Sequence, residues 1–283
     1  MKKCIIRLTV LLILALIPLG FWLQWADNAI EVTQYTVESE RLPSAFGGFR
    51  IAQISDLHND TLTDNNDSLV AFLQREQPDI IVVTGDLIDC RTPDEAVCLH
   101  VIERIVRIAP VYYVNGNHEA ALYKTYPQFE KDLRNLGVIV LNDEAVLLER
   151  SGQSITLLGL ADPNQSTLTD IQRMDLIAEY TQDGFTVVLC HRPELFASYC
   201  AAKADIVLTG HAHGGQVRLP IVGGLYAPGQ WLLPEYDAGM FTDGQTQMLV
   251  SRGIGNSLFP LRINNRPELP IVTLKTAATA TVG

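Results

Sequence analysis

Residues 80–89 have the sequence IIVVTGDLID, in which a run of β-branched residues leads directly into a glycine and two aspartates. Such a run, without polar alternation, is typical of a strand buried on both faces of a sheet. Asp86 and Asp89 therefore follow the end of a predicted central strand. In layered α/β folds, ligands bind in the crevice beyond the strand ends. The stretch predicts both a core strand and part of a binding site.

Four other stretches repeat this arrangement of an apolar run followed by polar residues. The runs at 51–55, 111–114, 186–190 and 206–209 lead into Asp56-Leu57-His58, Gly116-Asn117-His118-Glu119, His191-Arg192-Pro193 and Gly210-His211-Ala212-His213-Gly214. Because strand ends that are distant in sequence can converge, we expect these motifs to form one site. Imidazole and carboxylate groups together bind borderline divalent metals, so the sequence predicts a metal site.

Helical periodicity separates the predicted strands. Apolar residues recur at spacings of three and four over 67–76, 94–108 and 126–136, and more loosely over 167–180. After His213 the pattern changes to short strand-like runs at 216–219, 247–252 and 269–274, which predict an antiparallel closing sheet. We expect an α/β (α+β) fold with two packed sheets flanked by helices.

The N-terminus has the pattern of a membrane anchor. Lys2, Lys3 and Arg7 precede an uncharged stretch at 8–25 that is long enough to span a bilayer, and the next basic residue is Arg41. The positive-inside bias predicts a single-pass protein of the cell membrane with an extracytoplasmic domain. The expected organisation is an anchor at 1–26, a linker and first strand at 27–48, a catalytic domain at 49–275 and a flexible tail at 276–283.

Two other interpretations of the N-terminal segment stay open. A cleaved signal peptide shares the basic start and apolar core, although Gln24-Trp25-Ala26 lacks the small residues of a cleavage site. A buried core helix is disfavoured because the segment has no polar face. The disulfide state is also open, since the four cysteines beyond Cys4 allow three pairings.

Charge argues against nucleic acid as a partner. The formal net charge is −11, and no basic stripe is visible that could displace counterions from a phosphate backbone. Aromatic residues that would stack bases in a basic groove are not evident either. The oligomeric state cannot be inferred from the sequence.

The motifs together resemble a known superfamily. Their order, Asp-x-His, Gly-Asp-x-x-Asp, Gly-Asn-His-Glu, a single His and Gly-His-x-His, is similar to that of the calcineurin-like metallophosphoesterases from about residue 49 to residue 274. The segments at 210–216, 251–255 and 266–268 resemble the membrane-associated bacterial branch, which includes UDP-2,3-diacylglucosamine pyrophosphohydrolases. The resemblance implies a four-layer sandwich of two mixed β-sheets flanked by helices.

The resemblance also implies a dinuclear metal centre with a metal-activated hydroxide. Such centres hold two ions about 3.5 to 4 Å apart, and both neutralise charge on the phosphoryl group. Asp86 would bridge the ions, and the remaining ligands would be Asp56, His58 and His213 for one ion and Asn117, His191 and His211 for the other. A mixed nitrogen and oxygen set suits Mn, Fe or Zn, with Mn favoured here.

His118 and Asp89 are the expected catalytic pair. By resemblance, His118 protonates the leaving oxygen or stabilises the phosphoryl group, and Asp89 orients its ring. The substrate is expected to be a small-molecule or lipid-linked phosphoester, either a diester, a pyrophosphate or a monoester. The alternative is a membrane-anchored scaffold whose metal site is not catalytic. Arg192 could meet a phosphate or form a surface ion pair, and Asp162 is expected to serve a turn.

Overall fold

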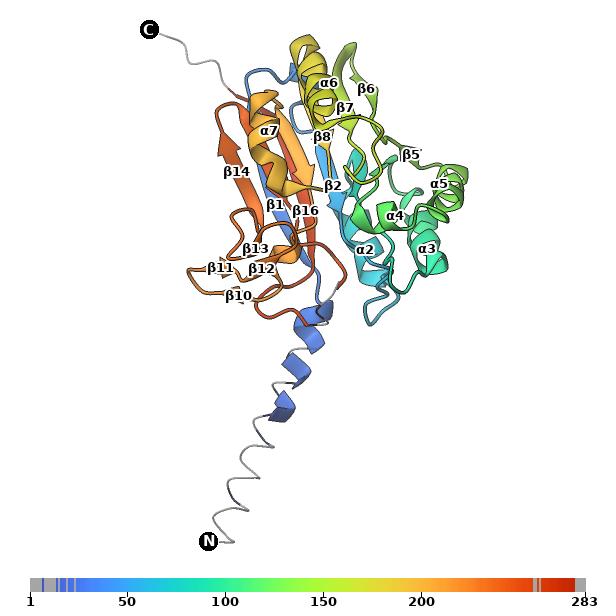
Figure 1. Ribbon diagram of the computed structural model, residues 1–283, viewed down its shortest axis with the longest axis vertical. Helices are drawn as coiled ribbons and strands as arrows, with labels where there is room; N and C mark the ends of the chain where they lie inside the picture. The colour runs from blue at the N-terminus through green and yellow to red at the C-terminus, as the bar shows by residue number, and fades with distance from the viewer. Residues whose placement is uncertain are drawn as a thin grey trace.

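Two six-stranded β-sheets form the frame of the computed structural model (Figure 1), which describes residues 7, 14, 16–18, 20–22, 24–256, 259 and 261–277. Sheet A has the order β1 (Glu31–Ser39), β16 (Glu268–Thr276), β2 (Arg50–Ile54), β3 (Ile80–Thr84), β4 (Val111–Val114) and β5 (Ile139–Val140). Sheet B has the order β14 (Gly239–Asp243), β15 (Thr246–Val250), β9 (Ile206–Thr209), β8 (Thr186–Leu189), β7 (Gln153–Gly159) and β6 (Glu144–Arg150).

The β-branched runs form the central strands because both of their faces are covered. One face of each sheet packs against the other sheet, where Ile51, Val82 and Val272 of sheet A share a cluster with Val187 and Leu208 of sheet B. The opposite faces are covered by helices, which gives four layers. A fully buried strand must be apolar on both faces, as the sequence of 80–84 predicts.

Helices cover the outer face of each sheet. On sheet A these are α2 (Asp67–Glu76), α3 (Glu95–Ile105) and α5 (Tyr126–Asn135), and on sheet B they are α6 (Asp170–Asp183) and α7 (Phe196–Ala201). Leu73 of α2 and Ile102 of α3 pack with Ile81, whereas Ile177 of α6 packs with Val207. The predicted mixed α/β fold with two packed sheets is therefore confirmed.

The antiparallel pairing predicted after His213 is found between β14 and β15, but the runs do not form a closing sheet of their own. β15 pairs in parallel with β9, and β16 pairs in parallel with β1 and antiparallel to β2. These apolar runs are taken up by the two central sheets, where they satisfy backbone hydrogen bonds and bury both faces. Among the described residues after His213, two short hairpins lie outside these sheets, namely β10 (Arg218–Leu219) with β11 (Gly223–Gly224) and β12 (Tyr226–Ala227) with β13 (Trp231–Leu232).

The N-terminal segment leaves the domain at the end that carries these hairpins (Figure 1). Its described residues at 14, 16–18, 20–22 and 24–28 are helical. Within the described part of the chain, no helix is both long enough and apolar enough to cross a membrane. Much of the predicted anchor at 1–26, and the predicted tail beyond residue 277, lie outside the described residues.

Candidate metal centre

The predicted ligands meet at the carboxyl ends of strands from both sheets. Asp56 follows β2 and Asp86 follows β3 in sheet A, whereas His191 follows β8 and His211 follows β9 in sheet B. The side chains of these four residues are almost fully buried. Facing edges of two packed sheets therefore supply one polar cluster inside an otherwise apolar core.

One group of side chains consists of Asp56, His58 and His213, whose possible ligand atoms lie within 4.8 Å of one another. His58 Nε2 lies 3.1 Å from His213 Nε2, and His213 Nε2 lies 3.4 Å from Asp56 Oδ1. Two imidazole nitrogens and one carboxylate oxygen therefore point at a common centre. This donor set suits a borderline divalent ion.

The second group consists of Asp86, His191 and His211. His191 Nε2 lies 3.1 Å from Asp86 Oδ2, while His191 Nδ1 bonds to the carbonyl oxygen of Thr84 at 2.7 Å. A carbonyl oxygen only accepts, so Nδ1 carries the proton and Nε2 faces the cluster. A hydrogen bond from the outer ring nitrogen is the usual way in which a histidine ligand is oriented.

Asn117, the further ligand predicted for the second group, has a side chain that would suit a metal ion. It is the first residue of α4 (Asn117–Ala121), directly after the turn that follows β4. Its Oδ1 atom is inaccessible to solvent and has no hydrogen-bond partner among the described residues. A buried acceptor without a partner is destabilising, and a cation would satisfy it.

Asp86 lies between the two groups. Its Oδ2 atom is 3.1 Å from Nε2 of His191, 3.7 Å from Nε2 of His58 and 3.9 Å from Nε2 of His118. Its Oδ1 atom accepts a hydrogen bond from the backbone N–H of His118 at 2.8 Å. The carboxylate is therefore held from one side and presents its other oxygen to histidines of both groups.

Backbone conformation at the cluster is unusual. Five of the seven predicted ligands have positive φ angles: Asp56 (52°), His58 (49°), Asp86 (51°), His211 (68°) and His213 (48°). Non-glycine residues adopt this left-handed conformation only rarely, and such conformations concentrate at functional sites. The strand ends therefore turn sharply so that short side chains point back over the crevice.

A glycine supports one of these turns by close approach. A Cβ atom on Gly210 would overlap the side chains of Ser55 and Asp56. The Asp56 carboxylate in turn accepts hydrogen bonds from the backbone N–H of His211 at 3.1 and 3.2 Å. The absent side chain at Gly210 thus lets the β2 and β9 ends lie together.

Burial and neighbouring charge set the protonation of the cluster. Burial raises the pKa of Asp56 to about 6 and lowers the pKa of His58 to about 3. Burial also disfavours the charged form of His191, but the neighbouring Asp86 carboxylate outweighs it and raises the His191 pKa to about 10. At neutral pH, protons and metal ions therefore compete for His191.

The His118 ring has one nitrogen, Nε2, on the side of the cluster and the other, Nδ1, on the side of the Cys90 backbone. Its Nδ1 atom accepts a hydrogen bond from the backbone N–H of Cys90 at 3.0 Å. Because this N–H can only donate, the neutral ring carries its proton on Nε2, which points toward Asp86. The predicted partner Asp89 lies 3.6 Å from Nδ1, beyond hydrogen-bond distance, and its carboxylate is ion-paired with Arg91.

Glu119 is a site residue whose role the sequence did not reveal. This fully buried carboxylate accepts hydrogen bonds from four backbone N–H groups, those of Asp86 (2.9 Å), Leu87 (2.7 Å), Ile88 (3.2 Å) and Gly116 (2.8 Å). It therefore joins the loop after β3 to the loop after β4. The one sequence feature that could have identified Glu119 as a site residue was its position in the Gly-Asn-His-Glu motif.

Arg192 and Asp162 form an ion pair beside the cluster. Arg192 Nε lies 2.6 Å from Asp162 Oδ2, and its NH1 atom lies 3.0 Å from Nε2 of His211. Asp162 Oδ1 also accepts from the backbone N–H of Asn164, as the predicted turn requires. Arg192 thus belongs to the wall of the cluster. Of the two predicted roles, the ion pair is observed, with buried Asp162 as the partner, and a contact with phosphate stays a prediction.

The four cysteines of the described part of the chain are free thiols. Cys98 and Cys190 are buried, and Cys190 accepts a hydrogen bond from the hydroxyl of Tyr199 at 2.9 Å. Cys190 directly follows β8 and packs in the apolar cluster under α6 and α7, where its thiol is structural.

Comparison with known proteins identifies the fold and the chemistry. A family model described as calcineurin-like phosphoesterase matches residues 49–215. The chain is 29% identical over 256 residues to the uncharacterized metallophosphoesterase YkuE of Bacillus subtilis, covering 88% of this chain and 86% of that protein. It is 27% identical over 238 residues to the phosphodiesterase YaeI of Escherichia coli, covering 80% and 82%.

Solved structures agree at the level of the fold. TT1561 of Thermus thermophilus superposes with a TM-score of 0.50 at 12% identity, over 73% of this chain and 90% of that one. The family model spans more than half of the sequence and includes every motif from Asp56 to His213. The chain therefore belongs to the calcineurin-like metallophosphoesterases and is a dinuclear metal hydrolase of phosphate esters.

Proposed function

We propose that this protein is a membrane-anchored phosphodiesterase that hydrolyses its substrate at the cluster around Asp86. The observation that carries the proposal is the convergence of buried carboxylates and imidazoles from five strand ends on one carboxylate. The resemblance to a named phosphodiesterase favours a diester over a monoester. A purely structural metal site would not need His118 beside a complete set of ligands.

The two side-chain groups would each hold one ion, with Asp86 shared between them. Asp56, His58 and His213 would form one set, and His191 and His211 with Asn117 would form the other. The unpartnered Oδ1 of Asn117 supports this assignment. Bound metals would lower the pKa of water and neutralise charge on the phosphoryl oxygens. The nitrogen and oxygen donors suit Mn, Fe or Zn, and we favour Mn.

His118 would supply the proton that the leaving group needs. Hydrolysis adds the oxygen of water to phosphorus and breaks one P–O ester bond, which gives an alcohol and a phosphate monoester. The hydrogen bond from Cys90 leaves the His118 proton on Nε2, on the side of the cluster. Asp89 lies 3.6 Å from Nδ1, and its carboxylate is ion-paired with Arg91.

The site would work outside the cytoplasm at the membrane surface. The basic start and the uncharged stretch at 8–25 support a single-pass anchor with the domain on the far side. Leu14, Phe21 and Trp25 of the described helical residues are exposed, as residues facing lipid would be. A substrate in or at the bilayer is consistent with this location.

The test uses the full-length chain in detergent with bis-para-nitrophenyl phosphate and para-nitrophenyl phosphate, with Mn added or chelated. Metal-dependent turnover that is lost in Asp86→Ala and His118→Ala would support the proposal, and the ratio of diester to monoester turnover would define the substrate class. A folded, metal-loaded protein that hydrolyses neither compound would favour the non-catalytic scaffold.

A further inference from the structure

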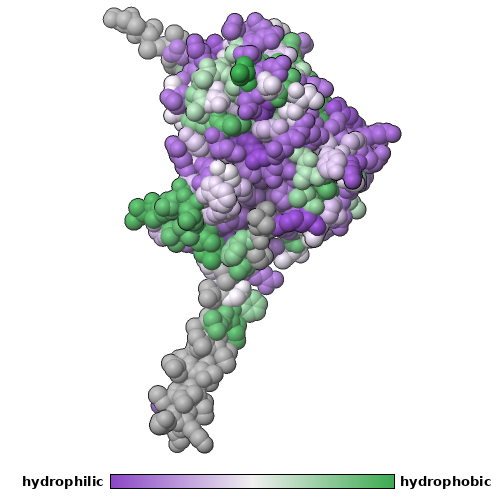
Figure 2. Space-filling model, in the orientation of Figure 1, coloured by the Kyte–Doolittle hydropathy of each residue, from purple (hydrophilic) through white to green (hydrophobic). Residues whose placement is uncertain are grey.

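An uncharged segment follows the last predicted ligand. Residues 219–234 contain no Asp, Glu, Lys, Arg or His, in a chain where 19% of residues are charged. They form the turn of the β10–β11 hairpin and the whole β12–β13 hairpin. Figure 2 shows this part of the molecule as a hydrophobic projection beside largely hydrophilic surface.

The apolar side chains of this projection point into solvent. The exposed fractions are 107% for Ile221, 77% for Leu232 and 71% for Trp231, and Leu219, Val222 and Leu233 are exposed as well. We call these six residues the hairpin surface. Single exposed apolar residues are ordinary, but a contiguous group marks an interaction surface.

The hairpins are fixed to the metal-site scaffold. The Asp237 carboxylate accepts hydrogen bonds from the backbone N–H of Gly224 at 2.5 Å and from Arg218 at 3.0 Å. Leu225 N–H donates to Gly215 at 3.1 Å, within the short 3₁₀ helix (His213–Gly215) that carries His213. The apolar tips are therefore held outward, and they cannot fold back without breaking these bonds.

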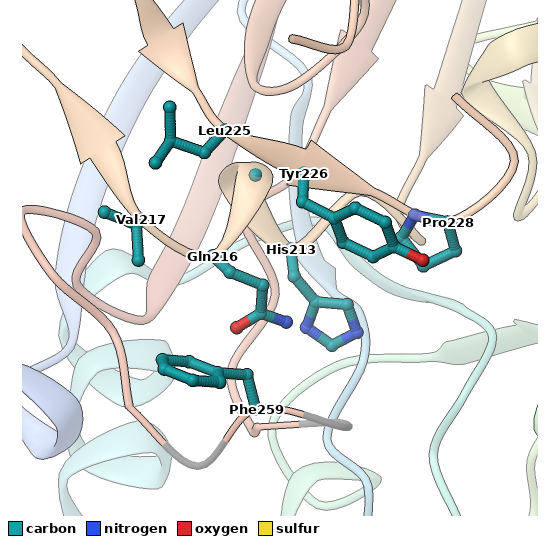
Figure 3. Close-up of a pocket in the computed structure, with 8 residues that line it drawn as sticks. His213, Gln216, Val217, Leu225, Tyr226, Pro228 and Phe259 are labelled. Atoms are coloured by element: carbon teal, nitrogen blue, oxygen red, sulfur yellow. The ribbon is translucent and has the colours of Figure 1, made fainter. Parts of the chain in front are cut away.

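A cavity lies at the base of the hairpins, and the predicted ligand His213 forms part of its wall. It has a volume of about 370 Å³, and its wall includes Val217, Leu225, Tyr226, Phe259 and the ligand residue His213. Figure 3 shows the imidazole of His213 with the rings of Tyr226 and Phe259 on either side. Its size and apolar lining are typical of ligand sites.

The same end of the molecule carries the N-terminal helix. One short loop contacts both elements, because the Arg262 N–H donates to Asp27 at 2.5 Å and the Arg218 N–H donates to the Ile263 carbonyl at 2.9 Å. The Arg266 guanidinium lies over the Trp25 ring at 4.9 Å. The exposed helix residues and the hairpin surface are therefore fastened to the domain side by side (Figure 1).

We propose that the hairpin surface inserts into the interfacial layer of a lipid bilayer, and that the cavity beneath it receives the hydrocarbon part of a lipid phosphoester. Tryptophan and aliphatic side chains without charges suit this layer, and a second apolar element at the same end favours a lipid surface over a protein partner. The substrate phosphate would then reach the metals past His213. The substrate assignment rests on the proposed function.

Insertion is tested by tryptophan fluorescence on the full-length chain. Trp22→Phe with Trp25→Phe leaves Trp231 as the single tryptophan of the three. Added to phosphatidylcholine vesicles with brominated acyl chains, Trp231 emission should shift to shorter wavelength and be quenched. The control is Leu147→Trp in a chain without other tryptophans, because Leu147 is 63% exposed on β6, away from the N-terminal helix.

Three results of the fluorescence experiment would overturn insertion of the hairpin surface. A protein that floats with the vesicles while Trp231 stays unquenched would show that the helix alone binds lipid. Equal quenching at positions 231 and 147 would show adsorption without a defined face. Self-association with Trp231 buried in the absence of vesicles would assign the hairpin surface to a second copy of the chain.

The cavity is tested with para-nitrophenyl phosphodiesters that carry methyl, butyl or octyl chains. KM should fall by about fourfold per methylene that enters the cavity, and Val217→Trp, which fills it, should flatten this dependence. Hydrolysis of all three esters with the same KM would overturn the assignment of the cavity. Hydrolysis of none would instead contradict the proposed function, and the fluorescence result would still stand.

Discussion

Replacing Glu119 with alanine should destabilise the domain more than any other single change to a carboxylate near the site. Its carboxylate accepts hydrogen bonds from four buried backbone N–H groups of two loops. A buried donor left without a partner costs about 1 kcal/mol or more, so four donors give a loss of about 4 kcal/mol. That is a large part of the 5–15 kcal/mol typical of a folded domain.

The loss is measured by thermal denaturation of the full-length protein with a chelator, so that metal binding does not contribute. For a domain of this size, about 4 kcal/mol corresponds to a Tm lower by roughly 8 to 16 °C. Glu119→Gln keeps one acceptor oxygen and should lose about half as much. Glu179→Ala on the exposed face of α6 is the matched control. A Tm change below 2 °C for Glu119→Ala would refute the reasoning.

Three further predictions concern the metal centre. His118→Asn should keep two metals per chain but lower kcat by about 10² to 10⁴-fold; a kcat within tenfold of wild type would contradict its role as the acid. Because the pKa of His191 is about 10 and metals need the neutral ring, apparent metal affinity should rise by up to about tenfold per pH unit between pH 6 and 8; calorimetric titrations showing no pH dependence would argue against His191 as a ligand. Gly210→Ala should displace Asp56 and reduce the metal content, whereas Gly184→Ala, where an added Cβ meets nothing within 4 Å, should not; equal metal content in the two variants would exclude the close approach as a cause.

The sequence predicts what depends on short-range patterns. The strand at 80–84 and the helix at 67–76 have the predicted bounds, because continuous β-branched runs and helical spacing are local signals. Convergence of the ligands could be predicted too, since each motif directly follows a strand and parallel strands end at one edge.

What the sequence could not predict depends on partners distant in the chain. The pairing of β16 with β1 joins residues more than 200 positions apart, and no local pattern specifies its direction. Three of the four N–H groups that bond to Glu119 lie over 30 residues away in the sequence. The hydrogen bond from Cys90 to His118, which occupies the ring nitrogen expected to face Asp89, likewise follows from the path of a loop.

The position of β16 has a consequence for the order of events during synthesis. Among the strands of the two described sheets this one is made last, yet it lies between β1 and β2, which are made before the others and do not pair with each other. A nascent chain that already contains every residue from Asp56 to His213 therefore still lacks β16, the strand that links β1 to the rest of sheet A. Because domains fold as units, a functional centre cannot be completed until residue 276 has left the ribosome. A protein exported as an unfolded chain would thus acquire its metals only at its destination, from the ions available there.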